Sequence, residues 1–355
     1  MSTRAYLDWN ATAPLRPEAR AAMRSADDLV GNPSSVHAEG RAAKAVIEDA
    51  RQAVAALLGC RPVEVVFTSG ATEAAGVLSN RPAGTNVIVE PTAHDCLLAH
   101  QRMDGSAIAG HILAMGLANS ETGVITEPPA KADAGYPYGA HRADWLLLDV
   151  VQAVGRIPFA FSWSGAEFAL VSAHKLGGPK GVGALIVRDG VDINSLRLGG
   201  GQEQGRRSGT ENVTGIAGFG AAAKAALRDL NDGLWDKVAA LRDALETRIA
   251  AETDAVIVGK DRLRLPNTSC LMVPGWKGET QVMQMDLAGF AISAGSACSS
   301  GKVKASRVLK AMGFDEMEAG SAIRVSFGPE TTDEEVARFG DAWLAQHAKF
   351  RARAA

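Results

Sequence analysis

Short apolar segments alternate with longer amphipathic ones over the first 210 residues of the chain. Six of the apolar segments end in small or polar residues, which predicts strands at 63–70, 86–91, 111–119, 145–150, 168–174 and 183–189. Several are apolar throughout, as is typical of strands buried on both faces of a mostly parallel sheet. The segment 39–59 has helical periodicity and stops at Gly59, a residue that commonly ends helices. This alternation predicts an α/β domain with helices covering a central sheet.

The pattern changes after residue 210. An Ala-rich stretch, 215–252, predicts one long helix, and the strands predicted after it are shorter: 255–259, 267–274 and 322–328. Helical patterns near 279–289 and 305–312 lie among them. We therefore expect a large domain over 15–230 and a smaller α+β domain formed by 1–14 and 231–355.

Composition narrows the class of protein. The chain has 355 residues, of which 46% are hydrophobic and 22% charged, and a formal net charge of −3. This balance gives no electrostatic case for nucleic acid or an anionic membrane as a partner. The N-terminus lacks a basic segment followed by an apolar run, and no apolar run approaches the ~20 residues of a membrane span. We expect a cytoplasmic protein.

The four cysteines are Cys60, Cys96, Cys270 and Cys298. Their spacing matches no C-x-x-C pair or zinc site, so no metal is expected, and a reducing cytoplasm disfavours disulfides. Cys298 is unusual because it lies among serines, alanines and glycines in "SAGSACSSGK" (293–302). It is either a passive filler or a nucleophile on a mobile segment.

Two predicted strand ends carry residues suited to cofactor chemistry. Lys175 follows the strand 168–174 in a Gly/Pro-rich turn, and a lysine amine placed beside another cation can form a Schiff base. Asp149 ends the strand 145–150, where a carboxylate needs a cation such as a protonated pyridine nitrogen. A solvent-facing lysine and a helix-capping aspartate are the alternative interpretations.

A phosphate site is also indicated. In "VVFTSGATEAA" (65–75) a strand leads through a turn into a helix, and backbone N–H groups with the Ser69 and Thr72 hydroxyls would cradle an anion. The turn is no dinucleotide or P-loop motif, and a simple helix cap is the alternative. His94 and Asn119 follow neighbouring predicted strands, at the edge where α/β folds bind ligands.

Together these residues resemble a known family. The ordered motifs include "TSGATE" (68–73), "N-x-E-x-G" (119–123), "D-x-x-Q" (149–152), "S-x-H-K-x-x-G-P-K-G" (172–181), "RSGTEN" (207–212) and "GSAC" (295–298). Over nearly the whole chain the sequence resembles cysteine desulfurases, pyridoxal phosphate (PLP) enzymes of the class V aminotransferase group with fold type I. The resemblance implies a sulfurtransferase that converts L-cysteine to L-alanine.

The resemblance also implies a role for each matching residue. Lys175 would hold the cofactor as an internal aldimine and move the Cα proton, His94 would stack on the ring, and Cys298 would take the sulfur as a persulfide. Asp149 would pair with the pyridine nitrogen and Gln152 with the phenolic oxygen. The residues implied for the cofactor phosphate are Ala71, Thr72, Ser172, His174 and, from the neighbouring subunit of a homodimer, Thr210.

Asn119 and Arg324 would bind the substrate carboxylate. The expected sulfur acceptor is another protein, such as an iron–sulfur scaffold. The chain departs from the family pattern at Ala74 and Ser120 and looks abbreviated over 76–118 and 128–143. A selenocysteine lyase, another class V activity and a non-catalytic scaffold remain alternatives, although an aminotransferase has no need of Cys298.

Overall fold

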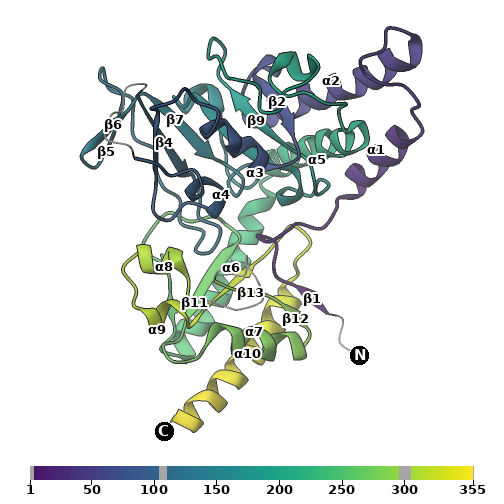
Figure 1. Cartoon of the computed structure of the whole chain (residues 1–355). Helices are drawn as coiled ribbons and strands as arrows, with labels where there is room; N and C mark the ends of the chain where they lie inside the picture. Colours follow the sequence, from purple (N-terminus) through teal and green to yellow (C-terminus); the bar gives the residue numbers. More distant parts are fainter. Residues whose placement is uncertain (1–3, 104–109, 296–304, 355) are drawn as a thin grey trace. The chain divides into compact units, whose positions relative to one another are not determined.

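The computed structural model describes residues 4–103, 110–295 and 305–354 (Figure 1). The chain divides into two compact units. One comprises residues 13–117 and 126–232, and we call it the sheet unit. The other comprises 1–12, 118–125 and 233–355, and we call it the C-terminal unit. The turn 118–125, which the sequence analysis placed inside 15–230, therefore belongs to the C-terminal unit.

The sheet unit is built on a six-stranded sheet in the order β2-β9-β8-β7-β4-β3. Its strands are β2 (Val65–Thr68), β3 (Asn86–Val89), β4 (His111–Gly116), β7 (Trp145–Asp149), β8 (Phe168–Ser172) and β9 (Gly183–Val187). β3, β4, β7 and β8 pair in parallel, whereas β9 is antiparallel to both β8 and β2. Every residue of β2, β3, β8 and β9 is buried, as the continuously apolar sequence predicts. The mostly parallel α/β sheet is confirmed.

Three long helices of the sheet unit pack together: α1 (Pro17–Asp27), α2 (Ala38–Leu58) and α5 (Val213–Asn231) (Figure 1). α2 confirms the predicted helix and ends at Gly59 in the left-handed conformation. Shorter segments complete the unit: α3 (Ala71–Ala74), α4 (Asp95–Leu98), the hairpin β5 (Tyr136–Tyr138) and β6 (His141–Ala143), and the 3₁₀ turns η1 (Pro62–Glu64), η2 (Ala75–Leu78), η3 (Phe161–Trp163), η4 (Ala173–Lys175) and η5 (Gln202–Gly205).

The single long helix expected over 215–252 is wrong. The chain forms two helices, α5 and α6 (Leu234–Glu252), separated at Asp232 and Gly233. Gly233 has φ = 67°, a left-handed conformation that glycine adopts without the steric cost of a Cβ. Helical periodicity on both sides of the break hid it, because a short "NDG" interruption changes the apolar pattern little.

The C-terminal unit has a four-stranded antiparallel sheet in the order β10-β11-β14-β13. Its strands are β10 (Val256–Ile257), β11 (Thr268–Met272), β13 (Ser293–Ala294) and β14 (Ala322–Ser326), and β1 (Ala5–Tyr6) pairs in parallel with β12 (Phe290–Ala291). The helices are α6, α7 (Gly278–Leu287), α8 (Arg307–Ala311), α9 (Glu316–Ala319) and α10 (Asp333–Ala354). Within the described residues, no helix combines the length and apolar character needed to cross a membrane.

Candidate active site

Most of the predicted site residues of the sheet unit follow strands that point the same way. β2, β3, β7 and β8 share one direction, so the turns that follow them meet at one edge of the sheet. The last residues of these strands and the turns after them carry the predicted residues Ala71, Thr72, His94, Asp149, Gln152, Ser172, His174 and Lys175. The topology therefore brings these residues to a single edge, as the sequence analysis expected.

Asp149 is the buried anion of this edge. Its side chain accepts a hydrogen bond from the Val151 backbone N–H at 2.9 Å. Burial raises the pKa of its carboxyl group, while that hydrogen bond and the charges of His94 and Lys175 act in the opposite direction. His94 and Lys175 are thus close enough to Asp149 for their charges to act on it, although they follow different strands.

His94 has a defined tautomer. It precedes the first turn of α4, and its Nδ1 accepts the Cys96 backbone N–H at 3.1 Å. A neutral ring therefore carries its proton on Nε2. Burial raises the pKa of the Cys96 thiol despite a hydrogen bond with the His94 ring, so Cys96 stays a neutral thiol beside the imidazole.

Gln152 is oriented by a residue that the sequence analysis missed. Its Oε1 accepts a hydrogen bond from Arg156 Nη1 at 2.6 Å, and a second nitrogen of Arg156, Nη2, donates to the Lys175 backbone carbonyl at 3.2 Å. Gln152 and Arg156 are both buried. Because the carbonyl end of Gln152 accepts from Arg156, its amide NH₂ is the end suited to donate to a ligand oxygen. The only sequence signal was the spacing i, i+4 between the two residues.

The predicted phosphate turn is tied to the segment that carries Thr210. The Ser69 backbone N–H donates to Glu73 Oε2 at 2.6 Å, and Arg207 Nε donates to Glu73 Oε1 at 3.2 Å. Burial raises the pKa of Glu73, but the bonds from Ser69 and the charge of Arg207 outweigh it, so the pKa lies below its ordinary value. Glu73 is therefore ionised and joins the turn to segment 207–212, where Thr210 is exposed. Because the Ser69 N–H donates to Glu73, an anion would use the N–H groups of Ala71 and Thr72.

Ser172 lies against the same turn. A Cβ added to Gly183, the residue opposite Ser172 in the β8–β9 ladder, would lie 2.7 Å from the Gly70 Cα. Only glycine permits this approach, which brings the start of β9 and the end of β8 against the turn. A cavity of about 60 Å³ adjoins the turn and is lined by residues that include Ser69, Arg207 and Glu211.

His174 is surrounded by positive charge. Burial, followed by the charges of Lys175 and Lys180, lowers its pKa to about 4. The ring is therefore neutral near pH 7, and its environment favours the approach of an anion.

Asn119 and Arg324 come together in the C-terminal unit. Arg324 Nη1 donates to the Ser120 carbonyl at 3.0 Å, and Nη2 donates to Asp8 Oδ1 at 2.7 Å. Asn119 Oδ1 accepts the backbone N–H groups of Glu121 and Thr122 at 2.9 and 3.0 Å. The oxygen of Asn119 thus closes its own turn, and its amide NH₂ is the end suited to a carboxylate.

Cys298 lies outside the described residues, and the other three cysteines have environments that suppress thiolate formation. Burial raises the pKa of Cys60 and of Cys270 to about 12, and it also raises the pKa of Cys96. Because the thiolate is the nucleophilic form, none of these three thiols is prepared to act as a nucleophile near neutral pH.

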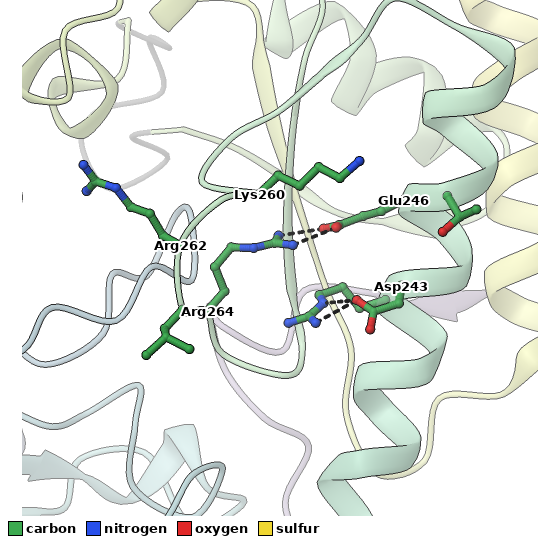
Figure 2. Close-up of a pocket in the computed structure, with 8 residues that line it drawn as sticks. Asp243, Glu246, Lys260, Arg262 and Arg264 are labelled. Atoms are coloured by element: carbon green, nitrogen blue, oxygen red, sulfur yellow. Dashed lines mark hydrogen bonds and ion pairs between the residues drawn. The ribbon is translucent and has the colours of Figure 1, made fainter.

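A cavity of about 440 Å³ is lined by none of the predicted site residues (Figure 2). It lies in the C-terminal unit between α6 and the loop 260–264. Arg264 donates to both oxygens of Glu246 at 2.7 Å, and Lys260 and Arg262 extend from the loop in different directions (Figure 2). Two of the arginines that line it, Arg242 and Arg264, form ion pairs with Asp243 and Glu246.

Comparisons with known proteins show the family of the chain. The family model "Aminotransferase class-V" matches residues 5–109 and 107–339. A cysteine desulfurase of Cereibacter sphaeroides is 38% identical over 94% of this chain and 93% of its own. A cysteine desulfurase of Frankia sp. is 39% identical over 95% of this chain and 89% of its own. A NifS-like protein of Rickettsia africae has a similar structure, with a TM-score of 0.85 and 28% identity over 97% and 99% of the two chains. The chain belongs to the aminotransferase class-V family.

That family depends on PLP, and PLP is the cofactor of this protein. The residues at the sheet edge fit it. Asp149 is a buried carboxylate that a protonated pyridine nitrogen would stabilise, and Lys175 is an amine within range of its charge. His174 provides a cation-rich environment for a phosphate.

Proposed function

We propose that the protein is a PLP-dependent cysteine desulfurase, which converts L-cysteine to L-alanine and transfers the sulfur to Cys298 as a persulfide. The observation that carries the proposal is the Asp149 site, where a buried carboxylate lies within range of the charges of Lys175 and His94. The curated relatives support the choice of reaction, because the two described above are named cysteine desulfurases.

When bound, PLP supplies an electron sink for carbanion chemistry at the substrate Cα. Asp149 keeps the pyridine nitrogen protonated, and the Gln152 NH₂ donates to the phenolic oxygen. Lys175 would hold the cofactor through its side-chain amine and would move the Cα proton. The His94 ring covers one face of the cofactor, in the tautomer that the Cys96 N–H fixes.

The phosphate is held by the backbone N–H groups of Ala71 and Thr72 and by the side chains of Ser172 and His174. Thr210 donates to the phosphate of a neighbouring subunit, so the active enzyme is a homodimer. This assignment is supported by the exposure of Thr210 on a segment that Arg207 fixes through Glu73.

Arg324 and Asn119 bind the carboxylate of L-cysteine. The Cys298 thiolate attacks the substrate sulfur, so the substrate C–S bond breaks, a new S–S bond forms on the enzyme, and the carbon skeleton leaves as alanine after protonation. The resemblance of the segment "GSAC" (295–298) to cysteine desulfurases assigns this role to Cys298, and the raised pKa values of the other three thiols support the choice. The persulfide sulfur then passes to a protein acceptor, of which an iron–sulfur scaffold in the cytoplasm is our specific proposal.

Product analysis with purified holoprotein tests this function. With L-cysteine and a thiol reductant, the wild type should release alanine and sulfide in equal amounts. Lys175→Ala and Cys298→Ala should both lose turnover, and only Lys175→Ala should lose the visible absorbance of the Schiff base. Cys60→Ser is the matched cysteine control and should retain activity. Undiminished sulfide release by Cys298→Ala would overturn the persulfide step. If the wild type turns over L-selenocysteine but not L-cysteine, the protein is a selenocysteine lyase instead of a desulfurase.

A further inference from the structure

The Nε group of Arg324 is a buried hydrogen-bond donor. Its side chain is about nine-tenths buried, with 10% of its surface exposed, and lies on β14 between β11 and β13. Nη1 donates to the Ser120 carbonyl and Nη2 to Asp8 Oδ1, but the buried Nε finds no hydrogen-bond partner among the residues that the structure describes. An unsatisfied buried donor costs about 1–3 kcal/mol, so this edge of the guanidinium is prepared for an incoming acceptor.

Asp8 is rigidly placed beside this arginine. The backbone of its neighbour Leu7 donates to the Ala291 carbonyl and accepts from the Ser326 N–H, each at 2.9 Å. Asp8 Oδ2 accepts the Ser293 hydroxyl at 2.9 Å while Oδ1 accepts from Arg324. Both carboxylate oxygens are thus engaged, and the carboxylate cannot follow the guanidinium if Arg324 turns.

The Nη1 end of the guanidinium is also held by a fixed acceptor. The Ser120 carbonyl accepts from Arg324 Nη1 and from Asn10 Nδ2, each at 3.0 Å. Asn10 is itself fully buried and bonds to Thr268 and Asn267 of the same unit. The position of Arg324 is therefore set from two sides, by Asp8 and by the turn that carries Asn119.

We propose that Asp8 is the positioning residue of the carboxylate site and restricts it to amino acids with one carboxylate. This inference rests on the proposed function, in which Arg324 binds the substrate carboxylate. Asp8 holds Nη2 so that the Nε edge remains for a side-on carboxylate. The negative charge of Asp8 also balances the positive charge of Arg324 before the substrate binds. A second carboxylate on the substrate is therefore repelled by Asp8 and finds no unbalanced positive charge at this site. The site thereby favours a small neutral side chain such as that of cysteine over an acidic one.

The ligands L-alanine and L-alaninamide isolate the contribution of the carboxylate, because neither has sulfur to transfer and only L-alanine has the carboxylate. Their dissociation constants can be measured from the absorbance of bound PLP in the holoenzyme. Asp8→Ala should raise the dissociation constant of L-alanine about tenfold, the effect of losing a charge-assisted hydrogen bond. The dissociation constant of L-alaninamide should change by no more than about twofold. Asp8→Asn keeps an acceptor for Nη2 without the charge, so it should restore most of the L-alanine affinity and bind L-aspartate better than the wild type does.

Asp286→Asn is the matched control. Asp286 also pairs with an arginine of the N-terminal segment, Arg4, but that pair is exposed. The affinities for L-alanine and L-alaninamide should therefore be unchanged in Asp286→Asn. Equal weakening of both ligands in Asp8→Ala, or no weakening of L-alanine, would overturn the proposal. If Asp8→Ala fails to fold, unchanged binding of L-aspartate by Asp8→Asn would overturn it instead. Arg324→Gln tests the proposed function separately from the role of Asp8. If this variant loses affinity for L-alanine and L-alaninamide equally, Arg324 does not bind the substrate carboxylate, whatever the result for the Asp8 variants.

Discussion

Arg156 and Gln152 form a buried hydrogen-bonded pair four residues apart along the chain, with 2.6 Å between Nη1 and Oε1. Through its other terminal nitrogen the same guanidinium holds the backbone carbonyl of Lys175. One arginine thus connects the residue proposed to donate to the cofactor's phenolic oxygen with the residue proposed to hold the cofactor covalently. Arg156 acts through them rather than on the cofactor, which makes it a positioning residue.

Arg156→Met should therefore weaken PLP binding without abolishing it. The substitution removes the hydrogen bonds that Arg156 donates to the Gln152 side chain and to the Lys175 backbone carbonyl, and we expect a several-fold rise in the PLP dissociation constant and a shift of the bound-cofactor absorbance. Equilibrium dialysis and absorbance spectra measure both. Arg61→Met, which removes an exposed arginine of the same unit, should change neither. An unchanged spectrum in Arg156→Met would exclude the positioning role.

A second buried arginine determines stability. Arg51 donates to both oxygens of Glu203 at 2.8 Å, and both side chains are more than nine-tenths buried. Arg51→Met should lower the free energy of unfolding by about 3–5 kcal/mol, because it leaves the Glu203 carboxylate buried without its cation. Urea unfolding followed by circular dichroism measures the loss.

The exposed pair of Arg248 and Asp341 provides the comparison for Arg51. Arg248→Met should cost less than about 1 kcal/mol, since solvent screens an exposed ion pair. The double substitution Arg51→Met with Glu203→Gln should recover part of the loss. A similar loss for the two single arginine variants would show that burial of the Arg51 pair has no special energetic consequence.

His174 gives a pH-dependent signal. Its pKa is about 4 in the folded chain and about 6.5 in the unfolded chain, so on acidification the unfolded state takes up the proton first. The group therefore lowers stability as the pH falls from 6.5 to 4 and has no further effect below 4. Because the ring is partly exposed, the effect is about 1 kcal/mol.

PLP should reverse the direction in which the surroundings of His174 shift its pKa. The phosphate dianion stabilises a protonated imidazole, so its pKa should rise on cofactor binding. NMR titration of the ring protons of His174 with and without PLP measures the change. If the His174 titration is the same in both samples, His174 does not contact the phosphate.

Cysteine reactivity should separate Cys298 from the other thiols. A thiol with a pKa of about 12, such as Cys60 or Cys270, is ionised on the order of one part in ten thousand at pH 8. Brief treatment of the native protein with iodoacetamide should therefore modify Cys298 and leave Cys60, Cys96 and Cys270 unmodified. Peptide mass spectrometry identifies the modified residue, and a faster reaction at Cys60 would contradict the assigned environments.

The sequence predicted the elements whose stabilising interactions are local or follow from periodicity. The six buried strands, the helix that ends at Gly59 and the cluster of site residues at one sheet edge all follow from continuous apolar runs and the polar residues after them. The break at Gly233 was missed because helical periodicity continues on both sides of a short turn.

The supporting residues of the site could not be predicted in the same way. Arg156, Glu73 and Asp8 are ordinary charged residues in the sequence, and their roles depend on contacts with residues distant along the chain. Asp8, for example, bonds to Arg324 and Ser293, each more than 280 positions away. Periodicity carries no signal for such pairings, which exist only once the sheet has formed.

The central claim is that Cys298 receives the sulfur of L-cysteine. The most direct measurement is mass spectrometry of the holoenzyme after one brief incubation with L-cysteine in the absence of reductant. We predict the mass of an added sulfur atom on the peptide that contains Cys298, released by a reducing thiol, and alanine formed in an equal amount. Alanine formation with the added sulfur on Cys60, Cys96 or Cys270, or on no cysteine, would contradict the account.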